Sequence, residues 1–191
     1  GNGGDWFELT VVGNGSFSEV DMRNWVITAT DGSASYDIEL NNDDQWCRVS
    51  SGAILTFIDT TSAGSGTGLA TWLNKTVEDR SAWSNFYTGD SRYFKSSSAP
   101  NFNGALAGSS APCDAAMGIT IKDSTAVVIS SADECDAAGG VADSQLFSLD
   151  SAPDAVPLTY TATSTSTFGS PNPLSAGGTA DFSNLRKGWG M

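Results

Sequence analysis

The chain contains no histidine, few basic residues and only three cysteines, and each shortage argues against some classes of function. Without His, the usual general base and the commonest metal ligand are both missing. Nine Lys and Arg against twenty-two Asp and Glu give a formal net charge of −13. Such a surface repels phosphate groups and anionic lipid. We therefore expect no nucleic-acid partner and no association with an anionic membrane.

The chain also lacks long apolar runs and recognisable catalytic motifs. No segment is long enough to span a bilayer, so no membrane insertion is expected. Neither a GxSxG elbow nor an SxxK pair is present, and no acidic pair stands out from the many Asp residues in expected turns. We expect a protein that is not an enzyme. The alternative is a secreted hydrolase whose two carboxylates meet only in the folded chain, as in a glycosidase.

The three cysteines fit neither a zinc pattern nor a CxxC redox motif. Cys113 and Cys135 lie in loop sequence on either side of one expected strand pair, and we predict a disulfide between them, with Cys47 buried and free. Disulfides persist in oxidising compartments, so an extracellular or cell-surface location is expected. The alternative is a cytosolic protein with three reduced, buried thiols. The chain begins with Gly1 rather than Met, as expected of a mature form whose leader has been removed.

Short runs with the period-two alternation of half-buried β-strands make up most of the rest. Residues 5–31 predict two strands joined by a loop rich in Gly, Asn and Ser. Residues 52–59 are more continuously apolar, as expected of a strand covered on both faces. Further strands are expected within residues 36–40 and 145–150, and a hairpin within 117–130 that turns at Asp123 and Ser124. The pattern predicts an all-β protein with a single domain over residues 1–191.

An irregular, aromatic-rich insertion is expected from about residue 60 to residue 116. Its aromatic side chains could stack on sugar rings, as ligand-binding residues of an extracellular glycan site, or could form a hydrophobic plug beneath the insertion. The residues proposed for sugar stacking are Trp72, Trp83, Tyr87 and Tyr93.

Two further segments carry candidate contact residues. The cluster at residues 41–44 could hold calcium through Asp43 and Asp44, although it lacks the spacing and distal Glu of an EF-hand, and the alternative is a solvated turn. The C-terminal tail, from about residue 159 to 191, ends with apolar residues that could dock on a second copy or fold back on their own domain. These candidate assembly contacts are Phe182, Leu185, Trp189 and Met191.

Several segments match one family in the right order. DWFELTVV and VDMRNWVITATDG are followed by SGAILTFID, GITIKD, QLFSLD, STSTFGSPN and DFSNLR. Over residues 5–186 the chain resembles the lamin-tail domain as it occurs in secreted bacterial proteins. The resemblance implies an immunoglobulin-like β-sandwich. It implies no catalytic residues and an accessory or structural role, and the chain departs from the family in its insertion and its cysteine pair.

These observations favour a secreted, non-catalytic structural subunit. A single sandwich without catalytic groups, basic character or a membrane segment has little to offer except contact surface. We expect it to assemble with copies of itself or to mediate extracellular contacts. The alternative is a carbohydrate-binding or adhesive accessory module.

Overall fold

The computed structural model describes residues 6–13, 18–31, 34–58, 83–88, 91–95, 118–137, 139–141, 146–151, 157–165, 172–174, 177 and 179–180. This part of the chain consists of short strands, with 3-10 helices only at η1 (Asp44–Trp46) and η3 (Glu134–Asp136). The predicted all-β class is confirmed. Within the described ranges, no helix is long and apolar enough to cross a membrane.

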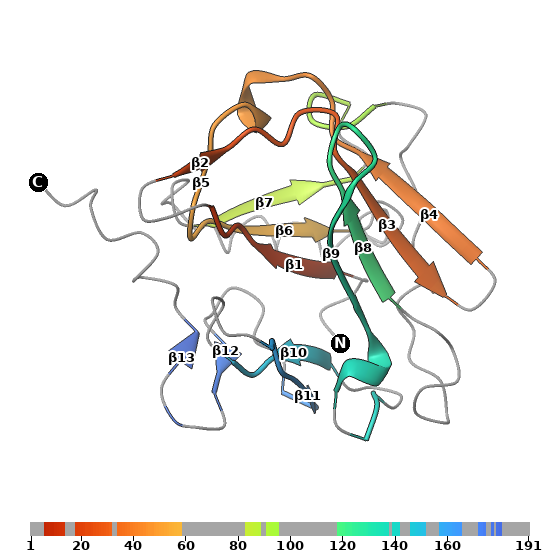
Figure 1. Ribbon diagram of the computed structural model, residues 1–191, viewed down its shortest axis with the longest axis vertical. Coiled ribbons are helices and arrows are strands. Elements are labelled where there is room, and N and C mark those ends of the chain that lie inside the picture. The colour runs from red at the N-terminus through yellow and green to blue at the C-terminus, as the bar shows by residue number, and fades with distance from the viewer. Residues whose placement is uncertain are drawn as a thin grey trace, which may run out of the picture.

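The larger sheet has four antiparallel strands in the order β4-β3-β8-β9 (Figure 1). Its strands are β3 (Val26–Asp31), β4 (Ala34–Glu39), β8 (Gly118–Lys122) and β9 (Val128–Asp133). Ile27 at its centre lies opposite Ile38 on one side and Ile121 on the other. Apolar side chains at alternate positions therefore share one face of the sheet. Both the strand expected within residues 36–40 and the hairpin expected within 117–130 are confirmed.

The second sheet has three strands in the order β1-β6-β7. Its strands are β1 (Trp6–Thr10), β6 (Ile54–Ile58) and β7 (Trp83–Tyr87), with β1 antiparallel and β7 parallel to β6. On β6, Leu55 and Phe57 are buried on one face, and Ile54 and Thr56 on the other. This confirms the prediction that residues 52–59 form a strand covered on both faces.

The two strands expected within residues 5–31 are present as β1 and β3, but they lie in different sheets. Between them, β2 (Glu19–Val20) pairs with β5 (Val49–Ser50). β1 instead pairs with β6, in a register that places Phe7 opposite Phe57. Alternation correctly predicted the strands, but pairing depends on contacts between segments far apart in the sequence.

One hydrophobic core joins the two sheets, and Trp46 lies at its centre. The indole is fully buried, and its Nε1 donates a hydrogen bond to the carbonyl oxygen of Tyr93 at 2.8 Å. Its ring packs against Phe86 with centroids 4.5 Å apart, and against Phe57 at 6.4 Å. Since the core also includes Ile27 of β3, the apolar faces of both sheets are buried against each other.

Two small strand pairs complete the described part of the chain. β10 (Leu146–Leu149) was expected from the sequence, and it pairs with β11 (Tyr160–Thr163), where Phe147 stacks on Tyr160 at 4.5 Å. β12 (Asn172–Pro173) pairs with β13 (Thr179–Ala180). Burial raises the pKa of Tyr160, and the nearby Asp136 raises it further. β11, β12 and β13 all lie in the C-terminal tail, where the polar sequence did not predict strands.

Candidate functional site

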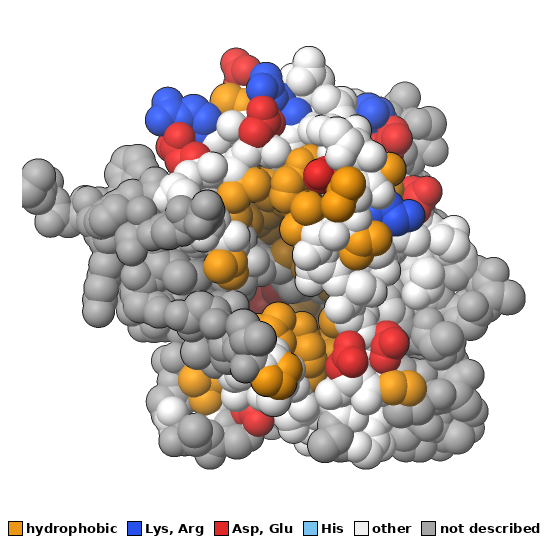
Figure 2. Space-filling view, viewed as in Figure 1, with side chains coloured by type: hydrophobic (Ala, Val, Ile, Leu, Met, Phe, Trp, Pro, Cys, Tyr) orange, Lys and Arg blue, Asp and Glu red, His pale blue; other side chains and the backbone are white. Residues whose placement is uncertain are grey.

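Strand β9 forms an exposed edge of the larger sheet. Within the described residues it pairs only with β8, and most of its side chains are exposed. Val127, Val128 and Ile129 are consecutive, and their exposed fractions are 56%, 53% and 52%. They are the most exposed of the large hydrophobic residues in the described ranges, where Val12 follows at 47%. Figure 2 shows hydrophobic side chains gathered around a hollow on the face of the molecule that carries this edge.

The turn before β9 is held by one carboxylate. Asp123 accepts hydrogen bonds from the backbone N–H and hydroxyl of Thr125, both at 2.8 Å, and from the backbone N–H of Val127 at 3.0 Å. The hydroxyl of Thr125 is the main reason that the pKa of Asp123 is lowered, and the backbone donors add to the effect. The turn accommodates Ala126 at a φ of 66°. The start of β9 is therefore fixed by its own sequence.

A β-bulge shapes the same edge. Ser130 lies opposite Ile121 and Val128 opposite Lys122, so Ile129 is the extra residue without a cross-strand partner. Bulges are common at sheet edges, where they turn side chains to new directions. Here the bulge lies where consecutive apolar side chains face solvent, and the regular ladder resumes from Ser130 to Asp133.

The edge is also electrically neutral in a strongly acidic chain. Residues 124–132 contain no charged residue, no Gly and no Pro, and they lie between Asp123 and Asp133. Segments with this composition pair readily with other strands. With a net charge of −13, such a neutral stretch is a place where another acidic surface can approach without direct repulsion.

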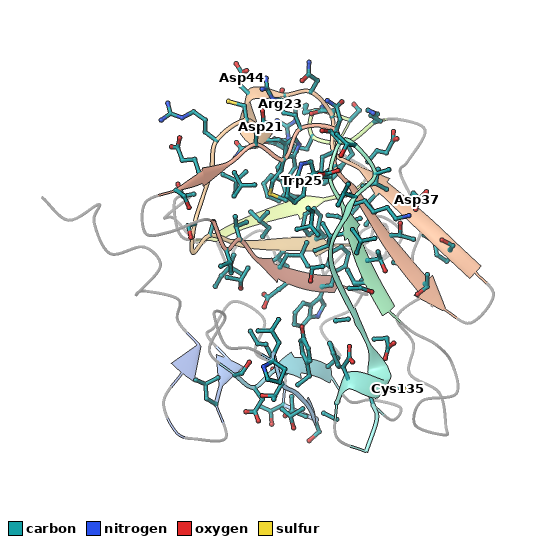
Figure 3. All side chains as sticks on the ribbon, in the orientation of Figure 1. Asp21, Arg23, Trp25, Asp37, Asp44 and Cys135 are labelled. Carbon is teal, nitrogen blue, oxygen red and sulfur yellow. The ribbon has the colours of Figure 1, made fainter. Side chains whose placement is uncertain are left out.

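The opposite edge of the sheet, at β4, is covered at its C-terminal end and carries charged side chains. The backbone N–H of Lys95 donates to the carbonyl oxygen of Glu39 at 3.0 Å, and Leu40 forms a bridge with Phe94. The ammonium of Lys95 also pairs with Glu39 at 3.3 Å. Asp37 is exposed along β4, while Cys135 follows β9 at the other edge (Figure 3). Charged side chains and covering segments are common ways to block an edge strand.

The structure describes Tyr93 among the predicted sugar-stacking residues and places it against the core. Its ring packs edge-on to Phe86 at 5.2 Å, and the guanidinium of Arg92 lies 5.3 Å from its centroid. Phe86 and Phe94 are buried in the same core, which favours the plug alternative for this part of the insertion. Trp72 and the side chains of Trp83 and Tyr87 lie outside the described residues, so sugar stacking stays a prediction.

Asp43 and Asp44 lie at the start of η1. The carboxylate of Asp43 accepts from the backbone N–H of Gln45 at 2.9 Å and caps this short helix, while the side chain of Asn41 accepts from the backbone N–H of Asp43 at 2.9 Å. The described ranges contain no group of three or more acidic or cysteine side chains placed to hold a metal ion. Calcium binding at this turn stays a prediction.

Charged side chains near η1 are engaged in exposed ion pairs. The guanidinium of Arg23 binds Asp21 at 2.5 Å, and Arg48 binds Glu19 at 2.6 Å. The hydrogen bond from the Arg23 side chain is the main reason that the pKa of Asp21 is lowered. Solvent and salt screen exposed pairs of this kind, so they orient side chains more than they stabilise the fold.

The structure describes one of the two cysteines in the predicted disulfide. Cys135 is exposed in η3, where its backbone N–H donates to Asp133 at 2.8 Å, while Cys113 lies outside the described residues. The Cys113–Cys135 disulfide therefore stays a prediction. Cys47 is a free thiol, but it is half-buried rather than buried, because it follows η1 at the surface. The proposed assembly contacts Phe182, Leu185, Trp189 and Met191 also lie outside the described residues.

The residue pattern predicted β9 as a strand but not as a contact edge. The signal was present, because three consecutive apolar residues, Val127, Val128 and Ile129, interrupt the alternation expected of a half-buried strand. Alternation alone does not distinguish an edge strand from a central one. A scan against protein-family models and searches of curated proteins and of solved structures found no match to the chain.

Proposed function

We propose that the chain is a secreted, non-catalytic structural subunit that assembles with copies of itself through strand β9. We further propose that it is a lamin-tail-type domain with an immunoglobulin-like β-sandwich. The support is the series of sequence segments, quoted above, that occur in the same order as in that family. The observation that carries the assembly proposal is the neutral edge at β9, with Val127, Val128 and Ile129 all more than half exposed.

A strand from a second copy matches what this edge lacks. An unprotected edge presents backbone donors and acceptors that another strand can satisfy, as in β-strand addition. Complete burial of a Val or Ile side chain contributes about 1.5–3 kcal/mol. Because Val127, Val128 and Ile129 are each about half exposed, burying the rest of each side chain would contribute about half of that free energy. The gain is comparable with the cost of association, so assembly should depend on protein concentration.

The net charge supports the same choice of contact. Copies that each carry −13 repel one another at low ionic strength. Salt screens this repulsion over a Debye length of about 8–10 Å near physiological strength. Assembly through a neutral edge should therefore be favoured by added salt, whereas a contact built on ion pairs would be weakened.

Replacing Ile129 by Lys tests the proposal. The substitution places a charge in the neutral edge at a side chain that is already 52% exposed, so the fold should be retained. Val12→Lys is the matched control, because Val12 is 47% exposed and lies after β1. In sedimentation velocity at rising concentration, the unmodified chain and Val12→Lys should associate, and Ile129→Lys should stay monomeric.

Two outcomes would contradict the proposal. An unmodified chain that stays monomeric at the highest soluble concentration, in low and in high salt, would exclude self-assembly. Equal association of all three proteins would show that copies meet elsewhere than at β9. Circular dichroism of each variant verifies that the fold is intact before the comparison is made.

A further inference from the structure

We infer that two copies join by antiparallel pairing of β9 with β9 about a two-fold axis, which merges their four-stranded sheets into one continuous sheet. The inference rests on the proposed function and adds the partner strand, its direction and the closure of the assembly. It identifies the occupant of the edge as the same segment of a second copy.

The partner strand follows from the asymmetry of the sheet. At β4, Glu39 and Leu40 already bond to Lys95 and Phe94, and Asp37 adds an exposed charge. At β9, the described residues contribute no strand beyond β8. Pairing of β9 with β4 of another copy would repeat without limit, but at Glu39 and Leu40 it requires displacement of that cover. Within the described residues β9 carries no such cover, so its complement is the same edge of a second copy, and such a contact closes as a dimer.

The direction follows from the carboxylates at the two ends of the neutral stretch. Parallel, in-register pairing would align Asp123 with Asp123 and Asp133 with Asp133, and like charges directly opposite are destabilising. Antiparallel pairing centred on Ser130 places Asp133 opposite Val127 of the second copy. No carboxylate then lies opposite another along the contact, so antiparallel pairing is favoured.

The same arrangement suits the two faces of the sheet. A two-fold axis normal to the sheet keeps the core-facing sides of both copies on one side. Ile119 and Ile121 face the core but are only half-buried, and they lie opposite Ala132 and Ser130. Extending the sheet beyond β9 would place a second strand beside Ala132 and Ser130 and so extend the core-facing surface that begins at these two isoleucines.

Photo-crosslinking of the full chain tests the geometry. A photoreactive benzophenone side chain replaces Ser131, which is exposed in β9, and the matched control carries it at Ser35, which is exposed in β4. Chains labelled with ¹⁴N and ¹⁵N are mixed at a concentration where sedimentation shows assembly, so that cross-links between copies have mixed masses. The Ser131 variant should react with residues 127–131 of the other copy, and the Ser35 variant should give no cross-link between copies.

The outcomes separate this inference from the proposed function. Assembly in sedimentation with cross-links from position 131 to β4 would overturn the two-fold contact and leave self-assembly standing. Cross-links from position 131 that centre on Ser131 rather than on Ile129 of the other copy, as parallel in-register pairing would give, would contradict the antiparallel direction. A protein that stays monomeric throughout overturns both proposals.

Discussion

Replacing Trp46 by Ala should lower the free energy of unfolding by about 3–5 kcal/mol, as expected for removal of a large buried aromatic side chain. The indole is fully buried and contacts aromatic rings from β6, from β7 and from the segment around Phe94. Its Nε1 hydrogen bond to Tyr93 would also be lost. Because single domains are stable by only about 5–15 kcal/mol, a change of this size removes much of the stability.

Urea denaturation followed by circular dichroism measures the effect, since this signal does not depend on the indole that is removed. Trp25→Ala is the matched control. Trp25 is only half-buried at the margin of the core, so its substitution should lower the free energy of unfolding much less. A loss below about 1 kcal/mol for Trp46→Ala would show that Trp46 is not the centre of the core.

Replacing Phe57 by Ala should cost a similar amount, about 3–5 kcal/mol. Phe57 is fully buried in the central strand β6 and stacks on Phe7 with centroids 4.9 Å apart. It also faces Trp46 at 6.4 Å, so the two substitutions remove part of the same contact. The double variant should therefore differ from the sum of the single variants by about 0.5–3 kcal/mol.

The same denaturation measurement on the two single variants and the double variant provides this comparison. Strict additivity would mean that Trp46 and Phe57 stabilise separate parts of the chain. It would contradict a single core shared by the two sheets, because residues without common partners contribute independently.

Local sequence patterns predicted about half of the described strands. They are β1, β3, β4, β6, β8, β9 and β10, which follow from alternating or continuously apolar runs. These patterns report which side chains are buried within one strand, and burial of Ile27, Ile38 and Phe57 agrees with them. Since the alternation arises within each segment, no knowledge of the partner strand is needed.

Other features depend on contacts that no local pattern contains. The parallel pairing of β7 with β6 joins Ile54 to Trp83 across a long stretch of chain, and the aromatic insertion was expected to be irregular. Trp46 is a single aromatic beside an acidic turn, so nothing in its neighbourhood indicates a central position. β11 consists of Thr, Ala and Tyr, and its strand structure depends on pairing with β10.

The site predictions were limited for a different reason. The residue patterns pointed to reactive side chains and sugar-stacking aromatics, whereas the candidate site is the edge of a strand with neutral, apolar side chains. An edge is defined by the missing neighbour, which only the arrangement of the strands reveals. The buried Phe86 and Phe94 illustrate the converse, because aromatic residues in a polar segment were consistent both with binding and with packing.

Hydrogen exchange at low and at high protein concentration tests the central claim, that β9 is the edge through which copies meet. Backbone amides paired with a second strand exchange slowly, while amides on an open edge exchange quickly. Mass spectrometry of the full chain should show protection of residues 124–133 rising with concentration, with no change over β4. Exchange in residues 124–133 that is the same at both concentrations, while sedimentation shows assembly at the higher one, would contradict the account.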